Sequence, residues 1–271
     1  MARRMMRDVT IGQFYPADSA IHRLDPRVKL TGTLVYIVSL FVFRTWGYLL
    51  GTAFLLLVIL LSKVPAGRLL KSLKPVWVLL LFMVLLNIFL TKGEIVWQWG
   101  ILHITREGLM QAAKMALRLV YLVIGASIMT MTTTPTKLTD GLERLLRPLN
   151  RVHVPVHEIA MMMSIALRFI PILLEEADRI KDAQKARGAD FASGSLVQRA
   201  KALMPLLVPL FVSAFRRAGD LAQAMEARCY TGGEGRTQMN PLQYRSRDTA
   251  AYVVLFAYLA AAIVLRAILG W

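Results

Sequence analysis

The hydrophobic positions along the chain first form long continuous runs. A helix needs roughly 17 to 25 apolar residues to cross a hydrocarbon core of about 30 Å. Five runs approach or reach that length when their flanking residues are included: 29–43, 46–62, 75–91, 108–131 and 249–270. The first two are short and adjacent, so they predict a helical hairpin. We therefore expect an all-α, polytopic membrane protein with about five spanning helices, with Trp97 and Trp99 in an interfacial loop after the third.

A second pattern fills residues 132–248, where apolar residues recur every three or four positions. This spacing is typical of amphipathic helices. It predicts a short helix that begins at Pro135 and closes by Pro148. It also predicts one long helix, or a pair of helices, bent near Pro171, and a further long helix that ends at Arg228. The last two are expected to run antiparallel or to cross.

Charge then gives the orientation. The mean hydropathy of +0.51 is too high for an ordinary soluble domain, so the net charge of +16 is read as a topology signal and not as a sign of nucleic-acid binding. Lys and Arg number six in residues 1–29, four in 63–74 and seventeen in 132–248, against three on the opposite side. We expect residues 1–28 to be a cytoplasmic segment without a cleaved signal peptide, 29–131 to hold spans 1–4, 132–248 to be a cytoplasmic helical domain and 249–271 to be a final span that ends outside.

Two basic residues, Lys114 and Arg118, fall inside the fourth run, where an unpaired cation costs at least about 2.5 kcal/mol. We expect this helix face to turn toward protein or the lipid headgroups; a solute path is the alternative. A stand-alone secondary transporter is the main competing class. It requires inverted repeats and acidic or polar groups near the midplane, whereas these spans contain few acidic residues and no internal repeat is apparent.

Catalytic and metal chemistry find little support in the sequence. The single cysteine, Cys229, excludes an internal disulfide and a thiolate cage. His153 and His157 have helical spacing, but Pro155 lies between them and argues against a regular helix there. The chain also lacks a Walker A pattern, so it does not bind ATP by that route. We expect no cofactor, no metal site and no catalytic residue in it. The acidic cluster Glu175, Glu176, Asp178 and Asp182 is expected to be structural, paired with Arg179, Lys181 or a neighbouring helix.

The two long amphipathic helices end in similar sequences, QKARGADF and AMEARCYTGG. A cation is favoured at a helix C-terminus, and glycine readily ends a helix, so each arginine has a structural explanation. The repetition weakens this explanation and makes docking the alternative, because a guanidinium on a slim tip can bind carboxylates in bidentate fashion. In the second copy Cys229 replaces the glycine. We expect this helix either to end nearer Thr231–Gly233 or to end in a different geometry.

Five segments carry a resemblance to a known family: HRLDPRVKL, TTTPTKLTDGLERLLRPL, MMMSIALRFIPILLEEADRIKDAQKARGADF, VQRAKALMPLL and SAFRRAGDLAQAMEARCYTGGEGRT. From residue 22 to about 237 the chain resembles the T component of energy-coupling factor transporters, the EcfT or CbiQ family. The resemblance implies a non-catalytic subunit of the prokaryotic cell membrane. Such a subunit joins two ATP-binding-cassette ATPases, which hold ATP and Mg, to one S component that captures a vitamin or metal ion. The sequence is most like the T components shared among several S components, and the solute stays open.

The resemblance also assigns roles to residues. The ATPase-docking residues are Ala186, Arg187 and Gly188 in one motif and Ala227, Arg228 and Cys229 in the other, and they define 132–248 as a coupling domain. We expect the S component to be held by an apolar, methionine-rich surface. Its predicted residues are Met161, Met162, Met163, Leu203, Leu206, Leu207 and Phe211; internal packing of the methionines is the alternative.

Overall fold

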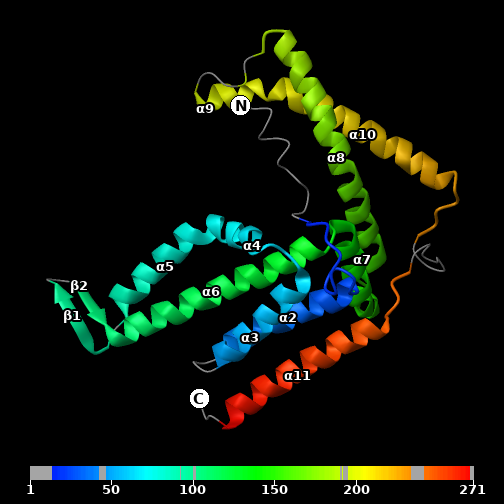
Figure 1. Cartoon of the computed structure of the whole chain (residues 1–271). Helices are drawn as coiled ribbons and strands as arrows, with labels where there is room; N and C mark the ends of the chain where they lie inside the picture. The colour runs from blue at the N-terminus through cyan, green and yellow to red at the C-terminus, as the bar shows by residue number, and fades with distance from the viewer. Residues whose placement is uncertain are drawn as a thin grey trace. The chain divides into compact units, whose positions relative to one another are not determined.

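The computed structural model describes residues 14–42, 47–91, 93–99, 102–189, 191, 195–232 and 241–268. The chain forms two compact units, Met1–Leu145 with Leu242–Trp271, and Leu146–Pro241. Both units are built from helices (Figure 1), as the hydrophobic pattern predicts. The unit boundaries differ from the predicted limits of the coupling domain, 132 and 248. The side of the membrane on which each segment lies stays a prediction.

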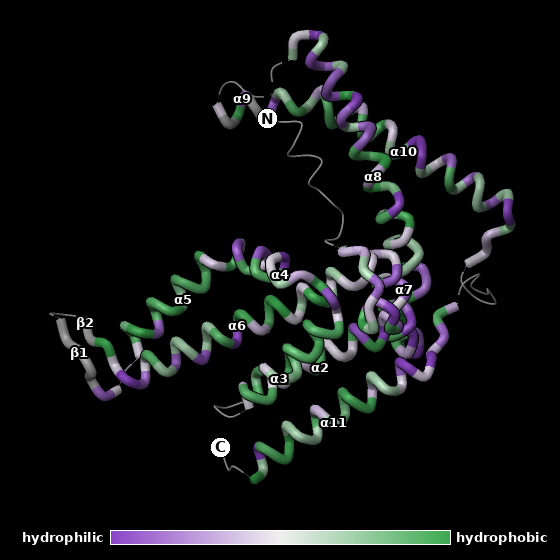
Figure 2. The backbone as a smooth tube through the Cα atoms, viewed as in Figure 1, coloured by the Kyte–Doolittle hydropathy of each residue, from purple (hydrophilic) through white to green (hydrophobic). Residues whose placement is uncertain are grey.

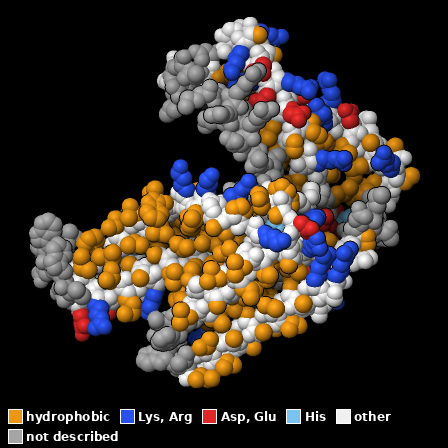
Figure 3. Space-filling model, in the orientation of Figure 1, with side chains coloured by type: hydrophobic (Ala, Val, Ile, Leu, Met, Phe, Trp, Pro, Cys, Tyr) orange, Lys and Arg blue, Asp and Glu red, His pale blue; other side chains and the backbone are white. Residues whose placement is uncertain are grey.

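The first unit contains most of the apolar runs. Its helices are α2 (Pro26–Val42), α3 (Gly47–Ser62), α4 (Ala66–Leu73), α5 (Trp77–Leu90), α6 (Arg106–Thr132), α7 (Pro135–Leu146) and α11 (Ser246–Ile268), with a 3-10 turn, η1 (Lys74–Val76), between α4 and α5. Hydrophobic residues dominate α3, α5 and α11 (Figure 2). Hydrophobic side chains also cover much of the visible face of this unit, while Lys and Arg gather over α4 (Figure 3). Such a surface suits a lipid environment.

Helices α2, α3, α6 and α11 enclose the core of this unit. Buried aromatic and aliphatic side chains meet there, and two pairs of hydroxyls hydrogen-bond across helices. Ser39 Oγ and Tyr258 OH are 2.6 Å apart, and Thr52 bonds to the hydroxyl of Tyr121. Buried hydroxyl groups need such partners. These pairs therefore fix which helix faces meet.

Helix α7 also packs in the first unit. It begins at Pro135, as predicted, because a proline at the first helical position loses no intrahelical hydrogen bond. A Cβ atom added at Gly141 would lie 3.0 Å from Cβ of Pro26, at the start of α2. Any side chain at this position would force Pro26 to shift, so glycine favours this approach. The contact brings residues 135–145 into the membrane-helix unit, although they lie inside the predicted coupling domain.

A short β-ribbon replaces the predicted loop after the third apolar run. Strands β1 (Ile95–Trp99) and β2 (Leu102–Thr105) pair antiparallel, with Gln98 opposite His103. Thr105 then caps α6, its side-chain oxygen accepting a hydrogen bond from the backbone N–H of Gly108 at 3.1 Å. The ribbon was missed because its strands are too short to give a clear alternating pattern.

Four helical segments among the described residues are long and apolar enough to cross a membrane: Ala66–Leu90, Arg106–Thr132, Val156–Ala186 and Ser246–Ile268. Helices α2 and α3, with 17 and 16 residues, are near the lower limit for a span. About five spans therefore agrees with the structure. The segment Val156–Ala186 was predicted to lie in the cytoplasm. Its apolar half comes first, and seven charged residues follow between Glu175 and Lys185, so the whole helix does not suit hydrocarbon.

The second unit consists of a 3-10 turn, η2 (Arg147–Val152), and the helices α8 (Val156–Ala186), α9 (Leu196–Ala202) and α10 (Met204–Glu226). Helix α8 continues through Pro171, so it is one helix of 31 residues and not a pair. Helices α8 and α10 pack against each other and cross (Figure 1). This confirms that two long amphipathic helices meet in this region.

Candidate functional site

Helix α8 ends in a compact hydrogen-bonded cap. The N–H of Gly188 donates to the carbonyl oxygen of Lys185 at 3.0 Å, and the N–H of Ala189 donates to that of Gln184 at 3.0 Å. Gly188 has a φ of 86°, in the left-handed region that glycine adopts without strain. These two bonds and the left-handed residue form a Schellman motif. Arg187 is the residue directly before the left-handed position.

Helix α10 ends in the same way, although a cysteine stands in the glycine's place. Cys229 has a φ of 54°, and its N–H donates to the carbonyl oxygen of Glu226 at 2.9 Å. The N–H of Tyr230 donates to the carbonyl oxygen of Met225 at 3.0 Å. Both sequence-based alternatives for this end are therefore wrong: the stop is not shifted, and its geometry is not different. The two hydrogen bonds hold Cys229 in a conformation that costs a side chain roughly 1 to 2 kcal/mol.

The six residues of the two tips are all exposed: Ala186, Arg187, Gly188, Ala227, Arg228 and Cys229. Within the part of the chain that the structure describes, neither Arg187 nor Arg228 uses its guanidinium in a hydrogen bond or an ion pair. An exposed guanidinium with all its donors available can bind a carboxylate or a phosphate in bidentate fashion. Each tip thus presents an exposed cation.

Two contacts show how α8 and α10 are paired. Arg217 Nη2 of α10 lies 3.2 Å from Glu176 Oε2 of α8, and Gln184 Nε2 donates to the carbonyl oxygen of Pro205 at 3.5 Å. Moving forward along α8 therefore means moving backward along α10, so the helices run in opposite directions. Glu176 confirms the predicted pairing of the acidic cluster with a neighbouring helix. Sequence reasoning missed Arg217, because its partner lies 41 residues away.

The tips are placed symmetrically about this ion pair. Arg187 follows Glu176 by eleven residues, and Arg228 follows Arg217 by eleven residues. At about 1.5 Å per residue, each arginine is about 16 Å along its own helix from the pair. Because the helices are antiparallel, the two arginines lie toward opposite ends of the α8–α10 pair.

The residues predicted to contact the S component fall into two separate groups. Met161, Met162 and Met163 lie in the first turns of α8, and Met162 is 60% exposed. The other group begins beside the end of α8, where Gln184 meets Pro205. About 20 residues of α8 separate the two groups, which is about 30 Å. The second group comprises the exposed Leu203, Leu207 and Phe211 and the half-buried Leu206.

The other residues considered from the sequence either have a structural role or do not come together to form a site. Arg118 Nε donates to the hydroxyl of Tyr48 at 2.9 Å, which confirms that this face of α6 turns toward protein. Helix α8 begins only at Val156, so His153 lies outside it and shares no helix face with His157. Among the described residues, no three His, Cys, Asp or Glu side chains gather as a metal site.

Comparison with known proteins places the chain among related sequences. Residues 17–239 match the family model CbiQ, described as cobalt transport protein. The chain is 51% identical over 270 residues to the energy-coupling factor transporter transmembrane protein EcfT of Acidaminococcus fermentans, an alignment that covers 98% of both chains. The same-named protein of Clostridium kluyveri is 55% identical over 250 residues, covering 91% of this chain and 93% of its own. That of Bacillus subtilis is 47% identical over 265 residues, covering 97% and 100%.

Proposed function

The chain belongs to the CbiQ family, and from this membership we propose that it is the transmembrane coupling subunit of an energy-coupling factor importer. Two ATP-binding-cassette ATPases bind ATP and Mg and dock on the two arginine tips. One S component in the membrane captures the vitamin or metal ion and selects it. The chain itself transmits motion and catalyses no reaction. Its apolar helices fit a multi-pass protein of the cell membrane.

The observation that carries the proposal is the same hydrogen-bonded cap at the two helix ends. Arg187 and Arg228 each precede a left-handed residue inside a Schellman motif. The cap satisfies the last backbone carbonyls, so the tip keeps one shape while its guanidinium stays exposed. Two equal tips suit two ATPases of related structure, each offering a groove with carboxylates.

The pairing of α8 and α10 supports a lever mechanism. ATP binding draws the two ATPases together and so changes the separation of the docked tips. Each tip is the end of a helix whose backbone hydrogen bonds resist bending, and the helices are joined at Glu176 and Arg217. Displacement of one tip is therefore carried through the contact to the other helix. The apolar residues of both helices pass this motion to the S component.

The surface for the S component is proposed as two apolar patches. One patch is formed by Met161, Met162 and Met163, and the other by Leu203, Leu206, Leu207 and Phe211. Methionine side chains adapt their shape to different partners, which suits a subunit shared by several S components.

The test is ATP-driven uptake in proteoliposomes that hold this chain with its ATPase pair and an S component. We expect Arg187→Glu and Arg228→Glu each to weaken ATPase capture and uptake, and the double variant to abolish both, because a reversed charge repels the carboxylates of the groove. Matched controls are Arg179→Glu on α8 and Arg216→Glu on α10, which reverse exposed charges away from the tips. These should retain uptake near the native level.

Unimpaired capture and uptake in the double variant contradicts the docking role of the arginines. Equal losses in the control variants contradict it too, since a general effect of charge is then sufficient. Solute movement by this chain without ATPases contradicts the coupling role and favours a secondary transporter.

A further inference from the structure

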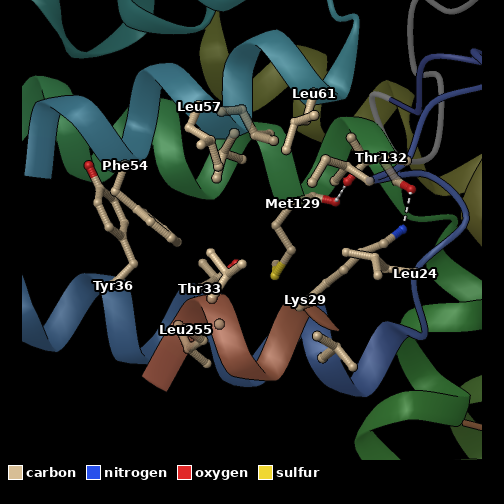
Figure 4. A pocket seen from close by; sticks show the side chains of 18 of the residues that line it. Leu24, Lys29, Thr33, Tyr36, Phe54, Leu57, Leu61, Met129, Thr132 and Leu255 are labelled. Carbon is tan, nitrogen blue, oxygen red and sulfur yellow. Dashed lines mark hydrogen bonds between the residues drawn. The ribbon is translucent and has the colours of Figure 1, made fainter. Parts of the chain in front are cut away.

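A cavity of about 550 Å³ opens in the first unit between α2, α3, α6 and α11 (Figure 4). Its volume lies in the range of small-ligand sites. Most of its lining is apolar, and Tyr36 and Phe54 stand at one end (Figure 4). Leu57 and Leu61 of α3 and Val254 of α11 also line it, and each is nearly half exposed. The cavity thus communicates with the apolar outer surface of the helices.

The opposite end of the cavity is basic. Helices α2 and α11 run parallel here: the N–H of Asp25 donates to the Asp248 carboxylate at 2.8 Å, and further along Ser39 bonds to Tyr258. Arg23, just before α2, and Arg247, in the first turn of α11, both line the cavity. Tyr36, ten residues after the start of α2, is about 15 Å further in. The cavity therefore has a cationic end and an apolar body.

Of the two arginines at the basic end, Arg23 has a carboxylate partner and Arg247 has none among the described residues. Asp18 pairs with Arg23, Asp25 pairs with Arg27 at 2.9 Å, and Asp248 accepts two backbone N–H groups. Nε of Arg247 is buried without a hydrogen-bond partner in the described part of the chain. The helix dipoles of α2 and α11 add positive potential at the same end. An unpaired buried guanidinium nitrogen beside two helix starts favours an anion.

We propose that this cavity holds one acyl chain of an anionic phospholipid, with the phosphate at Arg247. The apolar body takes the chain, the half-exposed leucines lead from it to the surrounding lipid, and Arg247 gains the acceptor that it lacks. Basic pockets between membrane helices bind anionic headgroups by the same electrostatics. The lipid joins α11 to α2 and α3 and so stabilises the packing of the last membrane helix. This site stands independently of the two arginine tips.

The measurement is native mass spectrometry of the full chain with phosphatidylglycerol or phosphatidylcholine of identical acyl chains. One phosphatidylglycerol should remain bound per chain, and Arg247→Gln should weaken its retention about fivefold toward that of phosphatidylcholine. Arg245→Gln is the matched control, because Arg245 is exposed and does not line the cavity.

A second pair of variants tests the apolar body. An added Cβ meets no atom within 4 Å at either Gly32 or Gly67, but only Gly32 lines the cavity. Gly32→Leu should remove the bound lipid, whereas Gly67→Leu should leave it. If Gly32→Leu does not fold, Ala251→Leu replaces it as the test, because Ala251 lines the cavity from α11. Equal retention of both lipids by the native chain, no retained lipid, or unchanged retention in the folded blocking variants overturns the proposal.

Discussion

At the scale of single residues, the two helix ends show that cap hydrogen bonds can hold a residue other than glycine in the left-handed conformation. Gly188 adopts the left-handed conformation freely, whereas Cys229 is held there by the bonds from its own N–H and that of Tyr230. Since Arg187 and Arg228 sit at equivalent positions, preserving the cap preserves the direction in which each guanidinium leaves its helix.

Substitutions at these two positions should shift stability in opposite directions. Gly188→Ala should lower the free energy of unfolding by about 1 kcal/mol, because a Cβ there meets no atom within 4 Å and the cost is conformational. Cys229→Gly should raise it by less than about 1 kcal/mol, since the released strain is partly offset by the greater freedom of glycine in the unfolded chain. Thermal unfolding of the purified full chain measures both. Destabilisation by Cys229→Gly argues against a strained cap.

At the scale of elements, two polar contacts join α8 and α10, which are long helices with few buried residues. The Arg217–Glu176 pair is about one-third exposed on each side, so its contribution to stability is below about 1 kcal/mol. In the proposed mechanism the pair serves to position the two helices. It fixes the register in which displacement of one helix reaches the other.

Reversing one charge should therefore affect coupling more than folding. In the reconstituted importer, Arg217→Glu should reduce ATP-driven uptake while ATPase capture persists, because both tips are intact but the helices repel each other. The exchanged pair Glu176→Arg with Arg217→Glu should recover much of the uptake. Full uptake in the single variant, or no recovery in the exchanged pair, contradicts a coupling role for this contact.

At the scale of the whole molecule, the charge asymmetry predicts the orientation of the chain. Residues 132–248 carry seventeen Lys and Arg, which favours the cytoplasm. The sole cysteine, Cys229, is exposed and lies in this region. A thiol reagent can therefore report the side of the membrane on which this region lies, without an introduced cysteine. Glu94, exposed just before β1, lies on the predicted opposite side.

A membrane-impermeant maleimide tests this orientation. In membranes that hold this chain without its ATPases, it should label Cys229 in inverted vesicles and not in intact cells. In a Cys229→Ala background, Glu94→Cys should show the reverse pattern, which controls for vesicle sidedness. Labelling of Cys229 from outside intact cells contradicts the predicted topology, including the cytoplasmic placement of the two tips.

The sequence by itself determined the helical elements and the family. Apolar runs and a period of three to four residues depend only on neighbouring positions, and Pro135 starts a helix through its own covalent geometry. The two arginine motifs could also be recognised in the sequence, because the residues of each motif are consecutive in the chain.

Only the tertiary structure decided which faces meet. The Arg217–Glu176 pair, the contact of Gly141 with Pro26, the link from Asp25 to Asp248 and the cavity beside Arg247 all join residues far apart in the sequence. Such contacts are selected by packing and by the need to pair buried polar groups, neither of which leaves a local pattern. The conformation of Cys229 had the same origin: residue preference opposed it, and the cap hydrogen bonds outweighed that preference.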